Sequence, residues 1–159
     1  MVDWIISLNT HFKCQPETLF RSIQILDRFL SKKVVQLYRF QLVGIGAFLI
    51  AVKLEEDLIK LSLAELSNAT ENTISSDELQ YIELIIAETL GYNFLVPTYH
   101  DFIPSEIYSD PHVIKHIYDL LEMSLFDYEL QLLHSPSEIV GLVNNKLSQC
   151  SVIVKNFSM

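Results

Sequence analysis

Residues 39–56, RFQLVGIGAFLIAVKLEE, constrain the fold of this chain more than any other stretch. Between Leu42 and Val52 no residue carries a charge, so a helix here is apolar on every face. Such a helix is either a membrane span or the central helix of a bundle. The apolar run is well short of the roughly 18 residues that a span needs, which favours a buried helix. Close approach of neighbouring helices is expected at its small residues, Gly44, Gly46, Ala47 and Ala51.

Four further helical patterns surround this segment. Apolar side chains recur at helical spacing, and Pro16 stands in a first helical turn, where proline is favoured. No period-2 pattern lasts long enough to indicate a sheet. We therefore predict an all-α bundle whose helices are residues 1–12, 16–32, 39–56, 62–69 and 77–90.

Two of these helices carry recognisable end signals. Ser62 and Glu65 have the spacing of a capping box, in which a serine and a glutamate satisfy each other's backbone amides. The last helix follows a serine cap, Ser75 or Ser76, and ends at Gly91, a good helix terminator.

A second group of helices is predicted after a linker at residues 93–97. It comprises a short helix near residues 99–107, a longer one over 111–125 and a last one from Pro136 onward. The expected domains are therefore residues 1–96 and 97–159.

Charge and composition exclude several classes of function. The net charge is −9 and the pI about 4.9, with no basic block, which argues against binding of nucleic acid. No secretory signal is visible at the start, so we expect Cys14 and Cys150 to be reduced thiols and the protein to be intracellular, in the nucleus or the cytoplasm.

No motif for catalysis, a cofactor or a metal is convincing. Gly44-Ile45-Gly46 lacks the third glycine and the preceding strand of a dinucleotide loop. His112, His116 and Asp119 share a helical face, but without further nearby ligands a zinc site is disfavoured. We expect a non-enzyme with no catalytic residues, no metal, no cofactor and no membrane association.

Several separated blocks, in this order, resemble the cyclin box of mitotic-type cyclins. They are Asp3-Trp4, Glu17-Thr18-Leu19, Asp27-Arg28-Phe29-Leu30-Ser31, Gln41-Leu42-Val43-Gly44, Lys53-Leu54-Glu55-Glu56, Glu83, Leu90-Gly91 and Pro97-Thr98. The resemblance extends over residues 1–102 and implies five helices packed around the third, which agrees with the helical patterns.

The same resemblance implies that both ends of the fold are incomplete. The first helix is expected to be truncated, and Asp27 to lack the upstream arginine with which it pairs in the family. A second box is expected to stop after about three helices. We therefore expect an apolar patch on it, formed by Ile139, Val140, Leu142, Val143, Leu147, Val152 and Ile153.

The function that the resemblance implies is binding and activation of a cyclin-dependent Ser/Thr kinase in G2/mitotic control of the cell cycle. A cyclin supplies no catalytic group. It presses on a regulatory helix and on the activation segment of the kinase, which sets the internal Lys–Glu ion pair of the kinase for phosphoryl transfer. Such activation is a population shift that requires better contact with the active state.

The resemblance places the kinase-binding site at the end of the central helix. Lys53 matches the kinase-contacting lysine of the family, although a lysine there also neutralises a helix C-terminus. Glu83 is a lone carboxylate in an apolar helix and needs a partner, which Lys53 would be. Glu56 is expected to join them. Apolar contact is expected from Ile50, Leu54, Tyr92 and Phe94, for which ordinary core packing is the alternative.

A patch for docking peptides of kinase substrates is implied at Trp4, Leu8, Phe40 and Gln41. Ser7 and Leu37 occupy positions that are usually acidic and basic, so the charges that orient a basic peptide are missing. We therefore expect docking to be altered or absent, and Trp4 to belong to the core.

Two alternatives remain open beside kinase activation. The protein is a kinase-binding scaffold or decoy if activation has been lost with the incomplete second box. A cyclin-fold transcription factor of the B type is disfavoured, because such proteins bind DNA with basic faces.

Overall fold

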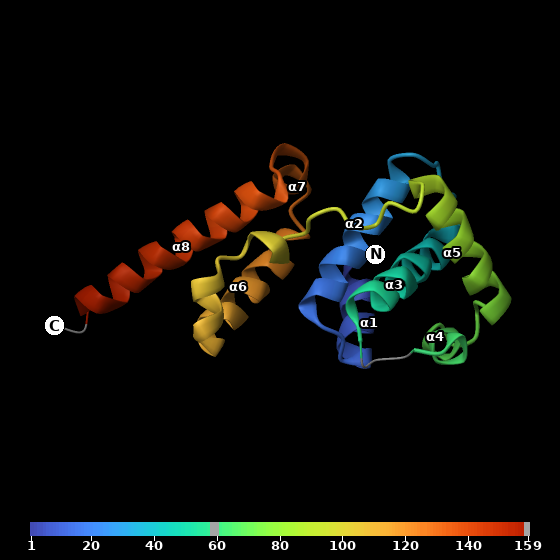
Figure 1. The fold of residues 1–159 in the computed structure, drawn as a ribbon, viewed down its shortest axis with the longest axis horizontal. Helices are drawn as coiled ribbons and strands as arrows, with labels where there is room; N and C mark the ends of the chain where they lie inside the picture. Colours follow the sequence, from blue (N-terminus) through green and yellow to red (C-terminus); the bar gives the residue numbers. More distant parts are fainter. Residues whose placement is uncertain (58–60, 158–159) are drawn as a thin grey trace. The chain divides into compact units, whose positions relative to one another are not determined.

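The computed structural model describes residues 1–57 and 61–157, without the side chains of residues 106, 109, 128, 132 and 147–157. Every element in the described residues is helical, which confirms the all-α class (Figure 1). The chain divides into two compact units, Met1–Val96 and Pro97–Met159. The first contains α1 (Val2–Phe12), α2 (Pro16–Leu30), the 3₁₀ turn η1 (Leu37–Arg39), α3 (Phe40–Glu55), α4 (Leu63–Ala69) and α5 (Ser76–Leu90). The segment between α3 and α4 includes residues 58–60, which lie outside the described residues.

Helix α3 is the core of the first unit. All its residues from Val43 to Val52 are buried, and α1, α2 and α5 pack around it (Figure 1). By length and composition alone, the helical stretch Leu37–Glu55 would also suffice to cross a membrane. From Val43 to Val52 this stretch is covered by the neighbouring helices, as expected for the central helix of a bundle.

Two glycines let helices approach α3 closely. A Cβ atom on Gly46 would lie 2.8 Å from Cγ2 of Ile82 and 3.0 Å from Cδ1 of Ile86, both on α5. A Cβ on Gly44 would lie 2.7 Å from the sulfur of Met1, beside α1. The close packing predicted from these small residues is therefore present on two sides of α3.

The predicted end signals of α4 and α5 are confirmed. Ser62 with Glu65, and Ser75 with Glu78, each form a complete capping box. Gly91 ends α5 in the left-handed conformation, at a φ of 62°. These caps fix where α5 begins and ends.

The second unit differs in detail from the prediction. Residues expected as one short helix form two 3₁₀ turns, η2 (His100–Phe102) and η3 (Ser105–Ser109). They are followed by α6 (Pro111–Ser124), α7 (Tyr128–Leu133) and α8 (Pro136–Phe157). Helix α7 was not predicted, although Asp127 caps it by accepting a hydrogen bond from the Leu130 amide.

The prediction of an exposed apolar patch on this unit is wrong for two of its residues, Ile139 and Val140. Ile139 and Val140 are 1% and 2% exposed, because α8 packs on α6 with these side chains inward. Leu142 is 48% exposed and Val143 half-buried. Leu147, Val152 and Ile153 lie outside the described side chains.

Candidate functional site

An ion pair joins the end of α3 to the middle of α5. The Lys53 ammonium lies 2.5 Å from a carboxylate oxygen of Glu83. Both side chains stay accessible, at 53% for Lys53 and 25% for Glu83. The pairing predicted for these residues is therefore present, at a surface open to solvent.

The apolar residues expected around this pair do not all reach the surface. Leu54 is 41% exposed, Tyr92 64% exposed and Phe94 half-buried. Ile50 is 4% exposed, because α3 is enclosed at that level, and this corrects its assignment to the contact surface. Leu84, next to Glu83 in sequence, is 47% exposed and was not predicted as part of the site.

Glu56 turns inward, which corrects its expected place beside Lys53. Its carboxylate accepts hydrogen bonds from the Gln15 amide at 2.6 Å and from the Thr18 hydroxyl at 2.7 Å. Glu56 thus ties the start of α2 to the end of α3. Burial, aided by the charge of Glu56 and a hydrogen bond to it, raises the pKa of the Cys14 thiol to about 12.

Sequence reasoning missed a second ion pair, which Arg21 forms with Glu55. The Arg21 Nε donates to Glu55 at 2.6 Å, and its side chain is 8% exposed. Its Nη1 donates to the Phe94 carbonyl at 3.1 Å and also to that of Val96. A signal was present, because Arg21 precedes the buried Ile25 by four residues and so falls on the apolar face of α2.

The four predicted docking residues differ in their exposure to solvent. Trp4 is half-buried against Gly44, where an added Cβ would lie 3.5 Å from its ring. Leu8 is 4% exposed and belongs to the core, which corrects its assignment to this patch. Phe40 is half-buried, one turn before Gly44, whereas Gln41 is exposed and lines an open hollow of about 520 Å³.

Among the side chains that the structure describes, no three His, Cys, Asp or Glu residues gather in a metal-binding arrangement. The groups that meet at the end of α3 offer hydrogen bonds and apolar contact area. Such an arrangement suits recognition of another protein.

Comparison with known proteins gives the family. Residues 1–95 match the family model of the cyclin N-terminal domain. The G2/mitotic-specific cyclin-B of Emericella nidulans is 38% identical over 89% of this chain and 30% of its own length. The G2/mitotic-specific cyclin-4 of Saccharomyces cerevisiae is 45% identical over 58% of this chain and 20% of its own length. This chain therefore spans a third or less of the length of these two relatives.

A solved structure supports the fold. The crystal structure of a viral cyclin from herpesvirus saimiri superposes with a TM-score of 0.76. The match covers 87% of this chain and 63% of the viral chain at 23% identity, so it bears on the fold alone. With the family model matching more than half of the sequence, and with the five α-helices of the first unit in place around α3, this chain belongs to the cyclin family.

Proposed function

We propose that this protein is a non-catalytic regulatory subunit that binds and activates a cyclin-dependent Ser/Thr kinase in G2/mitotic control of the cell cycle. The proposal rests on one observation above all, the accessible Lys53–Glu83 pair on the two helices where the resemblance expects kinase contacts. The mitotic names of the relatives agree with the proposed stage of the cycle. The proposed location is the nucleus or the cytoplasm, where such kinases act.

The chemistry of the pair suits recognition of a backbone. An ammonium group has three N–H donors, and Glu83 accounts for one of those of Lys53. The remaining donors, together with the free acceptor capacity of the Glu83 carboxylate, match the carbonyl and amide groups of another chain. Because each residue restrains the other, little side-chain freedom is lost when a partner binds.

Activation requires more than contact. The surface must bind the active conformation of the kinase more tightly than the inactive one, because equal affinity for both conformations leaves their populations unchanged. Leu54, next to Lys53 in sequence, and Tyr92, just after α5, supply exposed apolar area against which a kinase helix can pack.

Reconstitution with a cyclin-dependent kinase from the same source tests the proposal. We expect Lys53→Ala and Glu83→Ala each to weaken kinase binding by roughly tenfold or more, because each leaves the other charge unpaired in the interface. Lys33→Ala is the control, since Lys33 is an exposed lysine in the loop after α2, before α3 begins. Binding and histone phosphorylation at normal levels with the double variant would reject the site.

The same assay separates activation from mere binding. A scaffold or decoy captures the kinase without raising phosphorylation of a histone-type substrate. We expect phosphorylation to rise with the wild-type protein, and capture without activation would favour the alternative.

A further inference from the structure

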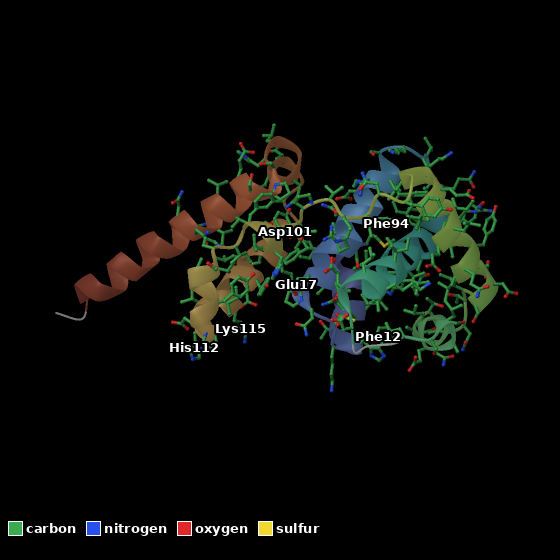
Figure 2. The ribbon with its side chains drawn as sticks, viewed as in Figure 1. Phe12, Glu17, Phe94, Asp101, His112 and Lys115 are labelled. Atoms are coloured by element: carbon green, nitrogen blue, oxygen red, sulfur yellow. The ribbon has the colours of Figure 1, made fainter. Side chains whose placement is uncertain are left out.

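We infer that Arg21 is a positioning residue: it fixes the segment that carries Phe94 relative to the end of α3, and so sets the kinase-binding surface. The inference rests on the proposed function, because it concerns the same surface. Figure 2 labels Phe94 on the segment that follows α5.

The first half of the argument is the contact with α3. Arg21 lies on α2 and is 7% exposed, so its charge must be paired. The pairing carboxylate is Glu55 in the last turn of α3, at 2.6 Å. Glu55 stands two residues after Lys53, so this ion pair anchors the turn of α3 from which Lys53 projects.

The second half is the contact with the segment after α5. Nη1 of Arg21 donates to the Phe94 carbonyl at 3.1 Å and to the Val96 carbonyl. Gln24, one turn further along α2, donates to the Val96 carbonyl at 3.2 Å and accepts from Arg21 at 3.3 Å. Two side chains of α2 therefore hold two carbonyls of this segment.

Backbone hydrogen bonds tie the start of this segment to α5, from the Tyr92 amide to the Ala87 carbonyl at 2.9 Å and from the Asn93 amide to the Leu90 carbonyl at 3.3 Å. Gly91 and Tyr92 both adopt left-handed backbone conformations, which take the chain out of α5. Beyond them, the Val96 amide bonds to the Phe94 carbonyl at 2.9 Å, a contact within the segment itself. Leu95 is 80% exposed and contributes little packing. The direction of the segment thus depends on its attachment to α2.

Arginine suits this position because of its shape. A guanidinium group is a planar fork whose separate N–H groups can serve a carboxylate on one side and carbonyls on another. The ammonium of a lysine is a compact charge at the end of a flexible chain. A lysine at position 21 can therefore keep the pair with Glu55 or reach the carbonyls of the segment, but it cannot span both.

A preformed surface binds more tightly than one that must be ordered on contact. The Lys53–Glu83 pair orders the charged part of the proposed kinase site, and Arg21 orders the part that contains Phe94. Arg21 itself is buried, so it would not contact a bound kinase. Its effect on kinase binding is therefore indirect.

The test compares Arg21→Lys with a control of similar expected cost to stability, Ser67→Ala. Ser67 is a buried residue of α4 that donates to the Ile74 carbonyl at 2.6 Å, a hydrogen bond between α4 and the loop before α5. The first measurement is the rate of chymotrypsin cleavage after Phe94 or Leu95 in the free protein, residues 1–159. The second is the dissociation constant for a cyclin-dependent kinase.

We expect Arg21→Lys to be cleaved roughly tenfold faster than the control and to bind the kinase roughly tenfold more weakly, with Ser67→Ala close to wild type in kinase binding. Equal cleavage of the two variants, or faster cleavage of Arg21→Lys with unchanged binding, overturns the inference. If the wild-type protein binds no kinase, the proposed function fails instead, and so does the role of Arg21 in binding. The cleavage rates still decide whether Arg21 holds the segment.

Discussion

The two glycines of α3 give a prediction with opposite signs at positions two residues apart. Replacing a helix-interior glycine with alanine gains roughly 1 kcal/mol of helix propensity. At Gly44, the new methyl group would meet the sulfur of Met1, the far end of a flexible side chain that can move aside. We therefore expect Gly44→Ala to stabilise the first unit by about 1 kcal/mol.

At Gly46 the same change meets atoms that cannot easily move. The closest, at 2.8 Å, is Cγ2 of Ile82, a branch directly on the Cβ of a buried side chain, and Cδ1 of Ile86 follows at 3.0 Å. Overpacking of this kind costs about 1–3 kcal/mol. Against the propensity gain, we expect Gly46→Ala to destabilise by about 0–2 kcal/mol, so the two variants differ by about 1–3 kcal/mol.

Urea unfolding followed by the fluorescence of Trp4 measures this difference. The chain has one tryptophan, and it lies on α1 in the first unit, so the signal reports on that unit. With a slope of roughly 1–2 kcal/mol per molar, a difference of about 2 kcal/mol separates the midpoints by about 1–2 M. Equal midpoints for the two variants would refute the close approach of α5 to α3 at Gly46.

Two further predictions concern titratable groups. Because burial raises the pKa of Cys14 to about 12, its thiolate is scarce at pH 8. We therefore expect iodoacetamide to label Cys14 at least about 100-fold more slowly in the folded protein than in the urea-unfolded chain. Labelling should be faster in Glu56→Gln than in wild type, and peptide mass spectrometry measures both rates. Asp27 is exposed as a whole residue, but desolvation of its carboxyl raises its pKa from 3.8 to about 6, so the folded state binds this proton more tightly than the unfolded state does. The contribution of Asp27 to stability is therefore present below pH 4 and lost as the pH rises through about 6; urea midpoints across this range should fall less in Asp27→Asn than in wild type.

Much of the first unit was predictable because its signals are local. An uninterrupted apolar run, serine–glutamate caps and a terminating glycine each depend on residues within a few positions of one another. Helix α7 escaped because it is a single short element, Tyr128–Leu133, whose length hardly shows a helical period. Burial at Ile139 and Val140 escaped because it depends on packing against α6, which no local pattern records.

The site was predictable only where one residue looked wrong for its surroundings. Glu83 interrupts an apolar helix, and that anomaly pointed to a partner, which the structure supplies in Lys53. Arg21 is the same kind of anomaly on α2. Its partners, however, are Glu55 and two backbone carbonyls more than 70 residues away in sequence, and carbonyls leave no mark on a sequence.

The sequence Lys53-Leu54-Glu55-Glu56 shows how one short motif serves both the fold and the surface. Lys53 and Leu54 project outward, where they are 53% (side chain) and 41% exposed. Glu55 turns to Arg21 in the interior. Glu56 follows the last helical residue with extended backbone angles, φ −107° and ψ 110°, and its carboxylate reaches the start of α2. The two inward carboxylates pin the end of α3 to α2 at separate points, and the outward pair is therefore presented from a turn that cannot fray. Removing either inward carboxylate should loosen the surface without touching a residue that a partner contacts, which distinguishes this arrangement from four independent surface charges.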